Sequence, residues 1–358
     1  MSSATIETAP ADTGKLWPLN AWYAVAWDAD IQHTLFPRTV CGEKLVLYRR
    51  SDGQVVALQD ACWHRMLPLS KGRLVGDDVE CGYHGLVFNS AGACTHMPSQ
   101  ERVLKQACVR SYPVIERHRF IWVWLGDPTL ADPATAPDMH WNRDPEWIGD
   151  GNTIHAKCDY RLVIDNLMDL THETFVHFSS IGNRAVAEAP FECTHDDRHV
   201  TVTRWMLDIE PPPFWARQIG KPGKMDRWQI IRFEPPGTVT IDVGVAVAGS
   251  GAPQGDRSQG VNAYVLNTVT PETATTSHYF WAIVRNYRLD EQRITTEMRN
   301  GVTGIFGEDE VILEAQQQAL ERYPERRMIN LNIDAGGVWS RRLIQRMINA
   351  ESGNATNT

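Results

Sequence analysis

The sequence of 358 residues lacks the features that mark secreted and membrane proteins. Its seven cysteines are odd in number and none follows Cys193, whereas the disulfide framework of a secreted domain is even in number and denser. The longest apolar run, at residues 120–125, is far shorter than the roughly 20 residues of a membrane span. The first ten residues, MSSATIETAP, have neither a basic end nor an apolar stretch, which indicates no signal peptide. We therefore expect a cytoplasmic protein with no membrane contact.

Basic residues are also scarce. The chain has 35 lysines and arginines against 44 aspartates and glutamates, a formal net charge of −9. Nucleic-acid binding depends on a lysine- and arginine-rich surface that neutralises phosphates, so we expect no nucleic-acid partner. With 42% hydrophobic and 22% charged residues, the composition is that of an ordinary globular protein with room for one large or two medium domains.

Changes of composition along the chain divide it into four parts. Residues 16–126 contain short apolar runs separated by turn residues, which predicts a domain of β-strands. Residues 127–150 are rich in proline and aspartate and have no periodicity, as is typical of a linker. Residues 151–350 combine helical and β-branched segments, and residues 351–358 are expected to be frayed.

The clearest motif pairs cysteine with histidine in two segments, CWH at 62–64 and CGYH at 81–84. A tetrahedral zinc site is the ordinary alternative, but zinc fingers usually place both cysteines in one loop and both histidines in the other. Here each loop carries one of each. A Rieske [2Fe-2S] cluster has two thiolates on one iron and two imidazoles on the other, which two such loops supply. The predicted cluster ligands are Cys62, His64, Cys81 and His84.

The cluster loops also indicate which kind of Rieske protein this is. Rieske proteins of respiratory complexes usually carry an extra cysteine in each loop, and these two cysteines form a disulfide. The loops here, CWHRML and CGYHGL, contain no extra cysteine. This favours the oxygenase and ferredoxin type.

A second group of candidate ligands lies at the end of residues 161–176, a stretch without glycine or proline that predicts a helix. His172 begins a segment similar to the HExxH motif of zinc proteases, but the second histidine is His177, at i+5. Positions i and i+5 point about 140° apart on a regular α-helix, so both imidazoles reach one metal only if the helix ends or bulges there. Two histidines with a distant carboxylate form the facial triad of non-haem Fe(II) oxygenases. Two structural histidines would be the better interpretation if no electron carrier preceded them.

The third ligand is expected to be a carboxylate far downstream, and residues 308–310 offer three. We assign Glu308 and Glu310 to solvent or to the N-terminus of a helix predicted over 308–322. Asp309 is the preferred ligand, because it shares a face of that helix with an expected inward stripe of Ile312, Leu313 and Gln316.

Together the two constellations resemble those of the Rieske non-haem iron oxygenases, and the similarity runs over nearly the whole chain. The stretches CDYRLVIDNLMDLTHETFVH, DRWQIIRFEPP and NIDAGGVWSRRLIQRM are similar to the vanillate O-demethylase branch of this family. TPETATTSHYFW is also similar to toluenesulfonate methyl-monooxygenases. The resemblance implies an α+β fold, with a Rieske antiparallel β-sandwich domain (16–126) followed by a helix-grip catalytic domain (151–350), and a head-to-tail homotrimer.

The resemblance also implies the roles of residues near the iron. Asn166 corresponds to a residue close to the iron, and Asp169 to the acidic residue that joins a ligand histidine of one chain to His84 of its neighbour. On a continuous helix Asp169 and His172 would share a face, as such a bond requires. The alternative is that Asp169 only supports the helix or caps an amide. Three residues are implied as the Fe(II) ligands: His172, His177 and Asp309.

The implied reaction needs a second protein. A flavin and iron–sulfur reductase takes electrons from NAD(P)H and passes them to the Rieske cluster, which supplies the iron site where O₂ reacts beside a small aromatic substrate. Hydroxylation of an aryl methoxy carbon gives a hemiacetal that collapses to a phenol and formaldehyde. The chain has no G-x-G-x-x-G segment after a predicted strand, which is consistent with a nicotinamide site on another protein.

The residues leave other interpretations open. A non-catalytic Rieske electron-transfer protein and a zinc-binding module are alternatives, as is hydroxylation of an aryl methyl group. The substrate is not identified: vanillate, isovanillate, anisate, veratrate and toluenesulfonate are all candidates. Asn267 corresponds to a substrate-contacting position in a methoxybenzoate-demethylating relative, although local hydrogen bonds at a strand end would explain it equally well.

Overall fold

The structure, a computed structural model, describes residues 15–98, 100–182 and 184–353. The first ten residues, for which we expected no signal peptide, lie outside this part of the chain, as do residues 354–358 of the expected frayed tail. Glu351, the first residue of that tail, is not frayed. It ends a helix, and its carboxylate accepts hydrogen bonds from the N–H groups of Leu19 and Asn20 at 2.6–2.9 Å.

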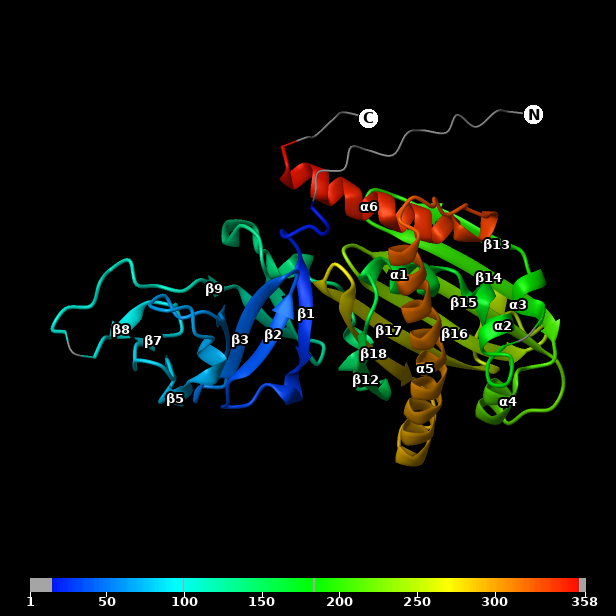
Figure 1. The fold of residues 1–358 in the computed structure, drawn as a ribbon. Coiled ribbons are helices and arrows are strands. Elements are labelled where there is room, and N and C mark those ends of the chain that lie inside the picture. Colours follow the sequence, from blue (N-terminus) through cyan, green and yellow to red (C-terminus); the bar gives the residue numbers. More distant parts are fainter. Residues whose placement is uncertain (1–14, 99, 183, 354–358) are drawn as a thin grey trace.

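The N-terminal domain consists of three small antiparallel sheets (Figure 1). The strand orders are β1 (Trp22–Trp27), β11 (Phe120–Trp124), β10 (Val114–Arg117); β2 (Phe36–Val40), β3 (Glu43–Arg49), β4 (Val55–Gln59), β9 (Ser111–Tyr112); and β5 (Arg73–Val75), β6 (Asp78–Glu80), β7 (Val87–Phe88), β8 (Cys94–His96). The second of these sheets is buried on both faces, because alternate side chains of β3 and β4 enter the two hydrophobic cores of this domain.

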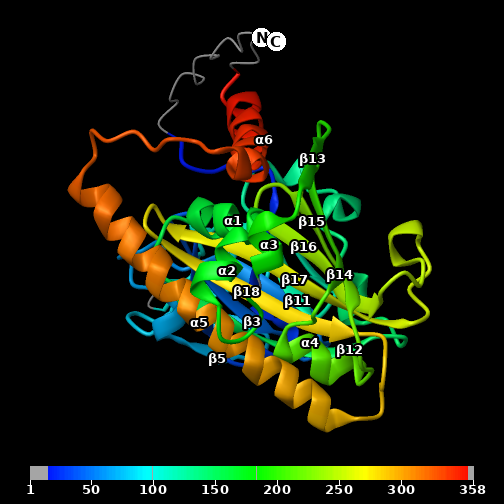
Figure 2. The same cartoon turned by 90° about the vertical axis from the view of Figure 1, so that its right-hand side faces the viewer.

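The C-terminal domain is built on one seven-stranded antiparallel sheet, with its helices on one face (Figures 1 and 2). The expected α+β fold is therefore confirmed. The strand order is β12 (Ile148–Ala156), β18 (Thr276–Arg285), β17 (Gly260–Thr273), β16 (Thr238–Val247), β15 (Met225–Glu234), β14 (Val200–Ile209) and β13 (Phe191–His195). The helices are α1 (Tyr160–Met168), α2 (Glu173–Val176), α3 (Arg184–Glu188), α4 (Pro213–Ile219), α5 (Gln292–Arg322) and α6 (Ala335–Glu351).

Two boundaries differ from the expectation. β12 begins at Ile148, so the last residues of the expected linker already belong to the large sheet. The helix expected over 308–322 begins at Gln292, because α5 continues through Gly301, Gly304 and Gly307. Each glycine lowers helix stability by about 1 kcal/mol. The helix forms nevertheless, because its apolar stripe packs on β12 and β18.

On the face of the large sheet opposite the helices, β17 and β18 pack against the N-terminal domain. Aromatic side chains of β1 and β11 form one core with residues of β17 and β18, and the rings of Phe120 and Phe280 lie 6.2 Å apart. Backbone bonds join the domains as well, from Cys41 N–H to the Pro271 carbonyl at 2.7 Å and from Gly42 N–H to the Glu272 carbonyl at 2.8 Å. Among the described residues, no helix has the length and apolar character needed to cross a membrane.

A buried histidine, His278, lies where the two domains meet. Its Nε2 is 3.1 Å from the Thr39 carbonyl, to which it donates, and its Nδ1 accepts from the Arg38 guanidinium at 3.4 Å. Burial, and then the charge of Arg38, lower the pKa of His278 from 6.5 to about 4, although the nearby Glu272 carboxylate opposes the shift. The imidazole of His278 is therefore neutral at physiological pH.

Replacing His278 with glutamine should make the domain boundary less sensitive to acid. In the unfolded chain this histidine takes up a proton near pH 6.5, whereas in the folded chain it does so only near pH 4, so acidification through this range favours unfolding. Between pH 7.5 and 5.5 the variant should lose about 1 kcal/mol less unfolding free energy than the parent. Urea unfolding at both pH values measures this difference, with His33→Gln as a control at an exposed histidine. Equal losses in parent and variant would contradict the prediction.

Candidate active site

Two loops at the end of the N-terminal domain farthest from the helices carry the cysteine–histidine motif (Figure 1). In both loops, 62–67 and 81–86, the cysteine N–H donates to the leucine carbonyl five residues later at 2.8 Å. The fifth residue of each loop has a positive φ, 59° at Met66 and 71° at Gly85. The two loops therefore have the same backbone shape although their histidines occupy different positions.

The four side chains of this motif gather at one place. The thiols of Cys62 and Cys81 are buried and contact each other. Burial, and then the neighbouring Cys81, raise the pKa of Cys62 to about 11 despite opposing backbone hydrogen bonds. The imidazoles of His64 and His84 are exposed, with ring centroids 4.5 Å apart. Two inner sulfurs and two outer nitrogens form the donor set that a Rieske cluster requires.

The helix expected over 161–176 is broken at Asp169, whose backbone is extended (φ −128°, ψ 101°). α1 ends before it, and a short 3-10 turn (Leu170–His172) and α2 follow. The Asp169 carboxylate accepts from the N–H of Thr171 at 2.9 Å and so caps this turn. His177 lies just after the end of α2. The helix end that the i+5 spacing requires is therefore present.

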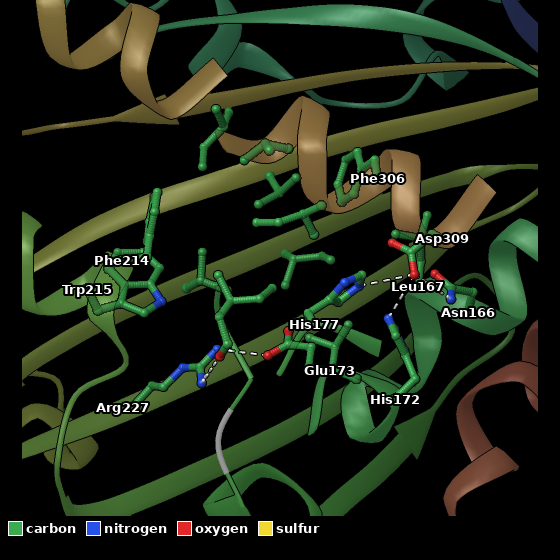
Figure 3. A pocket seen from close by; sticks show the side chains of 18 residues that line it. Asn166, Leu167, His172, Glu173, His177, Phe214, Trp215, Arg227, Phe306 and Asp309 are labelled. Carbon is green, nitrogen blue, oxygen red and sulfur yellow. Dashed lines mark hydrogen bonds and ion pairs between the residues drawn. The ribbon is translucent and has the colours of Figure 1, made fainter. Parts of the chain in front are cut away.

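His172, His177 and Asp309 converge, as Figure 3 shows. Their nearest donor atoms lie within 4.8 Å of one another. The Nε2 atoms of His172 and His177 are 3.3 and 3.1 Å from Asp309 Oδ1. His177 Nε2 is buried and has no hydrogen-bond partner among the described residues. Two imidazole nitrogens and one carboxylate fit the ligand set of a mononuclear Fe(II) ion.

Both imidazoles present Nε2 to the centre because Nδ1 is already bound. His172 Nδ1 lies 2.6 Å from the main-chain carbonyl of Asp169, and His177 Nδ1 lies 2.6 Å from Glu308 Oε2. Nδ1–H donates in each case, which leaves the Nε2 lone pair free for a metal. The expected contact between Asp169 and His172 therefore exists, but through the carbonyl and not the carboxylate, because the helix is broken at Asp169.

The two histidines and Asp309 shift one another's pKa values. Burial alone would lower the pKa of His172 and His177, but the nearby Asp309 carboxylate outweighs it, so both imidazole pKa values are raised. Burial would raise the pKa of Asp309, yet the two imidazoles lower it to about 2. The carboxylate is therefore ionised throughout the physiological pH range, as a metal ligand must be.

Glu308 and the inward stripe of α5 correct two expectations. Glu308 is in the middle of the helix and not at its N-terminus, and although it is exposed, as one of our two alternatives predicted, its carboxylate also holds His177. Ile312 and Gln316 are exposed, so they do not share the inward face. The buried side chains of this helix recur at i+3 and i+4 instead: Ile294, Thr295, Met298, Val302, Ile305, Asp309, Leu313 and Gln317.

Asn166 also reaches the centre. It lies on α1, and its Nδ2 donates to Asp309 Oδ1 at 3.2 Å. This bond holds the carboxylate of α5 from the neighbouring helix, which is consistent with the place near the iron that the family resemblance implies for Asn166.

A pocket opens beside the three ligands, between the helices and the large sheet (Figure 3). Its lining is mostly apolar and includes the rings of Phe214, Trp215 and Phe306. Glu173, the first residue of α2, forms a buried ion pair with Arg227 at 2.9 Å.

Comparison with known proteins agrees with this geometry. The family model of the Rieske [2Fe-2S] domain matches residues 21–113, and that of the vanillate O-demethylase oxygenase C-terminal domain matches residues 156–350. The chain belongs to the Rieske oxygenases. Because a catalytic-domain model matches more than half of the chain, neither a zinc module nor a lone electron-transfer domain describes this oxygenase.

Individual relatives are similar to this chain along nearly their whole length. The oxygenase is 45% identical to the vanillate O-demethylase oxygenase subunit of Pseudomonas sp. (strain HR199 / DSM 7063), over 94% of this chain and 96% of that protein. It is 40% identical to the iron–sulfur subunit of the toluene-4-sulfonate monooxygenase system of Comamonas testosteroni, over 93% and 98%. The crystal structure of dicamba monooxygenase with non-heme iron and dicamba superposes with a TM-score of 0.82, at 30% identity over 94% and 98%. The cofactors of the oxygenase are a Rieske cluster and a mononuclear iron.

Asn267 is not part of the pocket lining. It is fully buried in β17, where its Nδ2 donates to the carbonyls of Val239 and Val265 at 3.0 and 3.3 Å. Its Oδ1 accepts from the Tyr279 hydroxyl at 2.7 Å. The amide is therefore fully used inside the sheet. The structure favours local hydrogen bonding over the substrate contact that we expected for Asn267.

Replacing His64 or Cys81 with alanine is expected to remove the visible absorption of the Rieske cluster. Each variant loses one of four ligands, and the loops lose the group that joins them, so they should also become more susceptible to proteolysis. Absorption spectra and limited proteolysis of the purified oxygenase measure both effects. Cys94→Ala, in the same hydrophobic core as the cluster thiols, serves as the control and should keep the spectrum. An unchanged spectrum in either ligand variant would contradict the assignment.

Proposed function

We propose that the chain is the terminal oxygenase of a two-component Rieske monooxygenase that O-demethylates a methoxylated aromatic acid with O₂, giving a phenol and formaldehyde. The observation that carries this proposal is the apolar pocket that ends at His172, His177 and Asp309. Relatives named for O-demethylation support it, since they include vanillate and dicamba O-demethylases. Vanillate, dicamba and toluene-4-sulfonate are all aromatic acids.

Each part of the pocket has a task in this reaction. An Fe(II) ion bound by the three ligands supplies O₂ activation, because three protein ligands leave coordination positions open. Glu308 and Asn166 hold His177 and Asp309 in place. The apolar walls exclude water and hold the aromatic ring, so that its methoxy carbon faces the iron.

Electrons reach the iron from the cluster of a neighbouring chain in a head-to-tail homotrimer. Asp169 then lies between His84 of the neighbouring chain and His172 of its own chain. What supports this is the separation within one chain, where the cluster loops and α2 lie at opposite ends (Figure 1). Exposed apolar side chains at both ends also support it, because such groups are usually covered by another protein. They are Trp63, Met66 and Tyr83 on the cluster loops, and Phe175 and Phe178 near the iron ligands.

A second protein component delivers the electrons. The relatives are named as the oxygenase subunit or component of larger systems, so the chain has a partner. That partner is a flavin and iron–sulfur reductase that oxidises NAD(P)H. The system works in the cytoplasm, where the free cysteines of the oxygenase stay reduced.

The proposal is tested by reconstitution with such a reductase, NADH and O₂. Vanillate, isovanillate, anisate, veratrate and toluene-4-sulfonate are supplied in turn, and formaldehyde is measured. We expect formaldehyde from at least one methoxybenzoate, from protein that contains about three iron ions and two acid-labile sulfides per chain. Hydroxylation of the toluenesulfonate methyl group without formaldehyde from any methoxy acid would favour the second candidate, an aryl methyl monooxygenase, which the Comamonas relative supports.

A further inference from the structure

The polar residues that line the pocket form two separate groups (Figure 3). Asn166 and the three iron ligands lie at one end, and Arg227 lies at the other, with Glu173 between them. We propose that Arg227 binds the anionic group of the substrate, a carboxylate or a sulfonate, and that Glu173 is a positioning residue that fixes the guanidinium. This inference rests on the proposed function, because it assumes an aryl substrate whose reacting carbon faces the iron.

Arg227 is the cation that the described pocket offers. It comes from β15 and is only 2% exposed. Its Nη2 donates to Glu173 Oε2 at 2.9 Å and its Nη1 donates to the Ile181 carbonyl at 3.3 Å. A guanidinium has five N–H donors, so donors remain for a ligand, and Nε has no partner. The Nε atoms of four further buried or half-buried arginines also lack a hydrogen-bond partner, but of the five only Arg227 lines the pocket: the other four are Arg38, Arg50, Arg204 and Arg285.

Glu173 compensates the positive charge of Arg227 in the apolar pocket when no substrate is bound. A buried charge without a partner is strongly destabilising, and the carboxylate supplies that partner when no substrate is present. Glu173 is itself held from a second side, because Gln229 Nε2 donates to its Oε1 at 2.8 Å. The carboxylate is thereby fixed, and it keeps the planar fork of Arg227 in one orientation, the form in which arginine binds carboxylates and sulfonates best.

The two ends of the pocket set the orientation of the substrate. With the anionic group at Arg227 and the methoxy carbon at the iron, the ring lies against the apolar side chains that line the rest of the pocket. A methoxy group next to the acid group on the ring remains at the arginine end, whereas a meta or para methoxy group extends toward the iron. The oxygenase should therefore demethylate 3-methoxybenzoate in preference to 2-methoxybenzoate, by at least about tenfold in kcat/KM.

Two variants test the role of Arg227 without leaving a buried charge alone. The double variant Arg227→Met/Glu173→Gln removes both members of the ion pair and keeps their approximate volumes. Arg227→Lys keeps the charge and loses the planar fork, and it carries the test if the double variant does not fold. Arg285→Lys is the matched control, because Arg285 is also fully buried with an unpaired Nε but lies outside the pocket lining.

Binding is measured by calorimetry on the iron-loaded oxygenase without O₂, using 3-methoxybenzoate and the uncharged 3-methoxybenzamide. The double variant should bind the benzoate about 10- to 100-fold more weakly than the parent, with the amide changed by no more than about twofold. Arg227→Lys should show a smaller loss for the benzoate alone, and Arg285→Lys none. Unchanged affinity for the benzoate, an equal loss for both ligands, or no binding of the benzoate by the parent would overturn the inference.

Formaldehyde release by the parent separates this result from the proposed function. A parent that binds 3-methoxybenzoate through Arg227 but releases no formaldehyde would refute O-demethylation and leave the anion site standing. If the parent releases formaldehyde while the double variant binds the benzoate normally, the anion site is refuted and O-demethylation is supported. Equal kcat/KM for the 2- and 3-methoxy isomers would overturn the proposed orientation.

Discussion

Replacing Asp309 with alanine is expected to remove the mononuclear iron and to lower formaldehyde release at least about 100-fold, while the visible spectrum of the Rieske cluster stays unchanged. The variant keeps His172 and His177, but two imidazoles without a carboxylate bind Fe(II) weakly. The cluster is unaffected because its loops lie at the far end of the other domain. Iron analysis with the absorption spectrum measures both metal sites in one sample.

The neighbouring acids provide the controls for this experiment. Glu310→Ala should keep the third iron, since Glu310 is not one of the three converging ligands. Glu308→Ala should weaken iron binding by about 10- to 100-fold, because His177 loses the carboxylate that orients it. If Asp309→Ala still binds the third iron and turns over, the ligand is Glu308 or Glu310 and the triad described above is wrong.

Replacing Asp169 with asparagine is expected to stop turnover and to leave both metal sites and the proposed trimer in place. Asparagine keeps the oxygen that accepts from Thr171 N–H, and the main-chain carbonyl that holds His172 is not altered. The local fold should therefore survive. What the variant loses is the negative charge and the second oxygen, the features that a bridge to the neighbouring chain's His84 requires.

Rapid mixing of the reduced variant with O₂ and substrate, followed by cluster absorbance, measures the electron transfer directly. Reoxidation should be slowed by at least about 100-fold. Asp159→Asn is the matched control, because Asp159 caps α1 in the same way, accepting from Arg161 N–H at 2.9 Å, but takes no part in the iron site. Reoxidation as fast as in the parent would show that electrons cross without the Asp169 carboxylate.

The sequence predicted which residues come together at the two candidate metal sites, but not the residues that surround them. The cysteine–histidine spacing and the i+5 histidine pair each constrain one kind of chemistry, so they could be recognised without a structure. From the sequence, the i+5 spacing of the histidines showed only that the helix must end or bulge, and not that it breaks at Asp169. Residues 161–176 contain no residue that ends a helix, and the extended backbone at Asp169 is stabilised by a cap that many aspartates could form.

The residues around the ligands depend on contacts between distant segments. Glu308 and Asp309 are neighbours with similar chemistry, and only the packing of α5 decides which one faces the iron and which one holds His177. Arg227 and Glu173 are 54 residues apart in the sequence, one on β15 and the other at the start of α2, and they meet only in the folded chain. Neither pair has a spacing pattern, which explains why the sequence did not predict the contact of Glu308 with His177 and did not single out Arg227.

Because the two metal sites lie far apart within one chain, two inactive variants that each lack a different metal site should restore activity when they are mixed. If a chain takes electrons only from its neighbour, Cys81→Ala supplies an intact iron site and Asp309→Ala supplies an intact cluster. Trimers assembled from equal amounts of the two dead variants should then regain activity by complementation, with about a quarter of all neighbouring pairs placing a working cluster beside a working iron. A chain that fed its own iron would show no recovery at any mixing ratio.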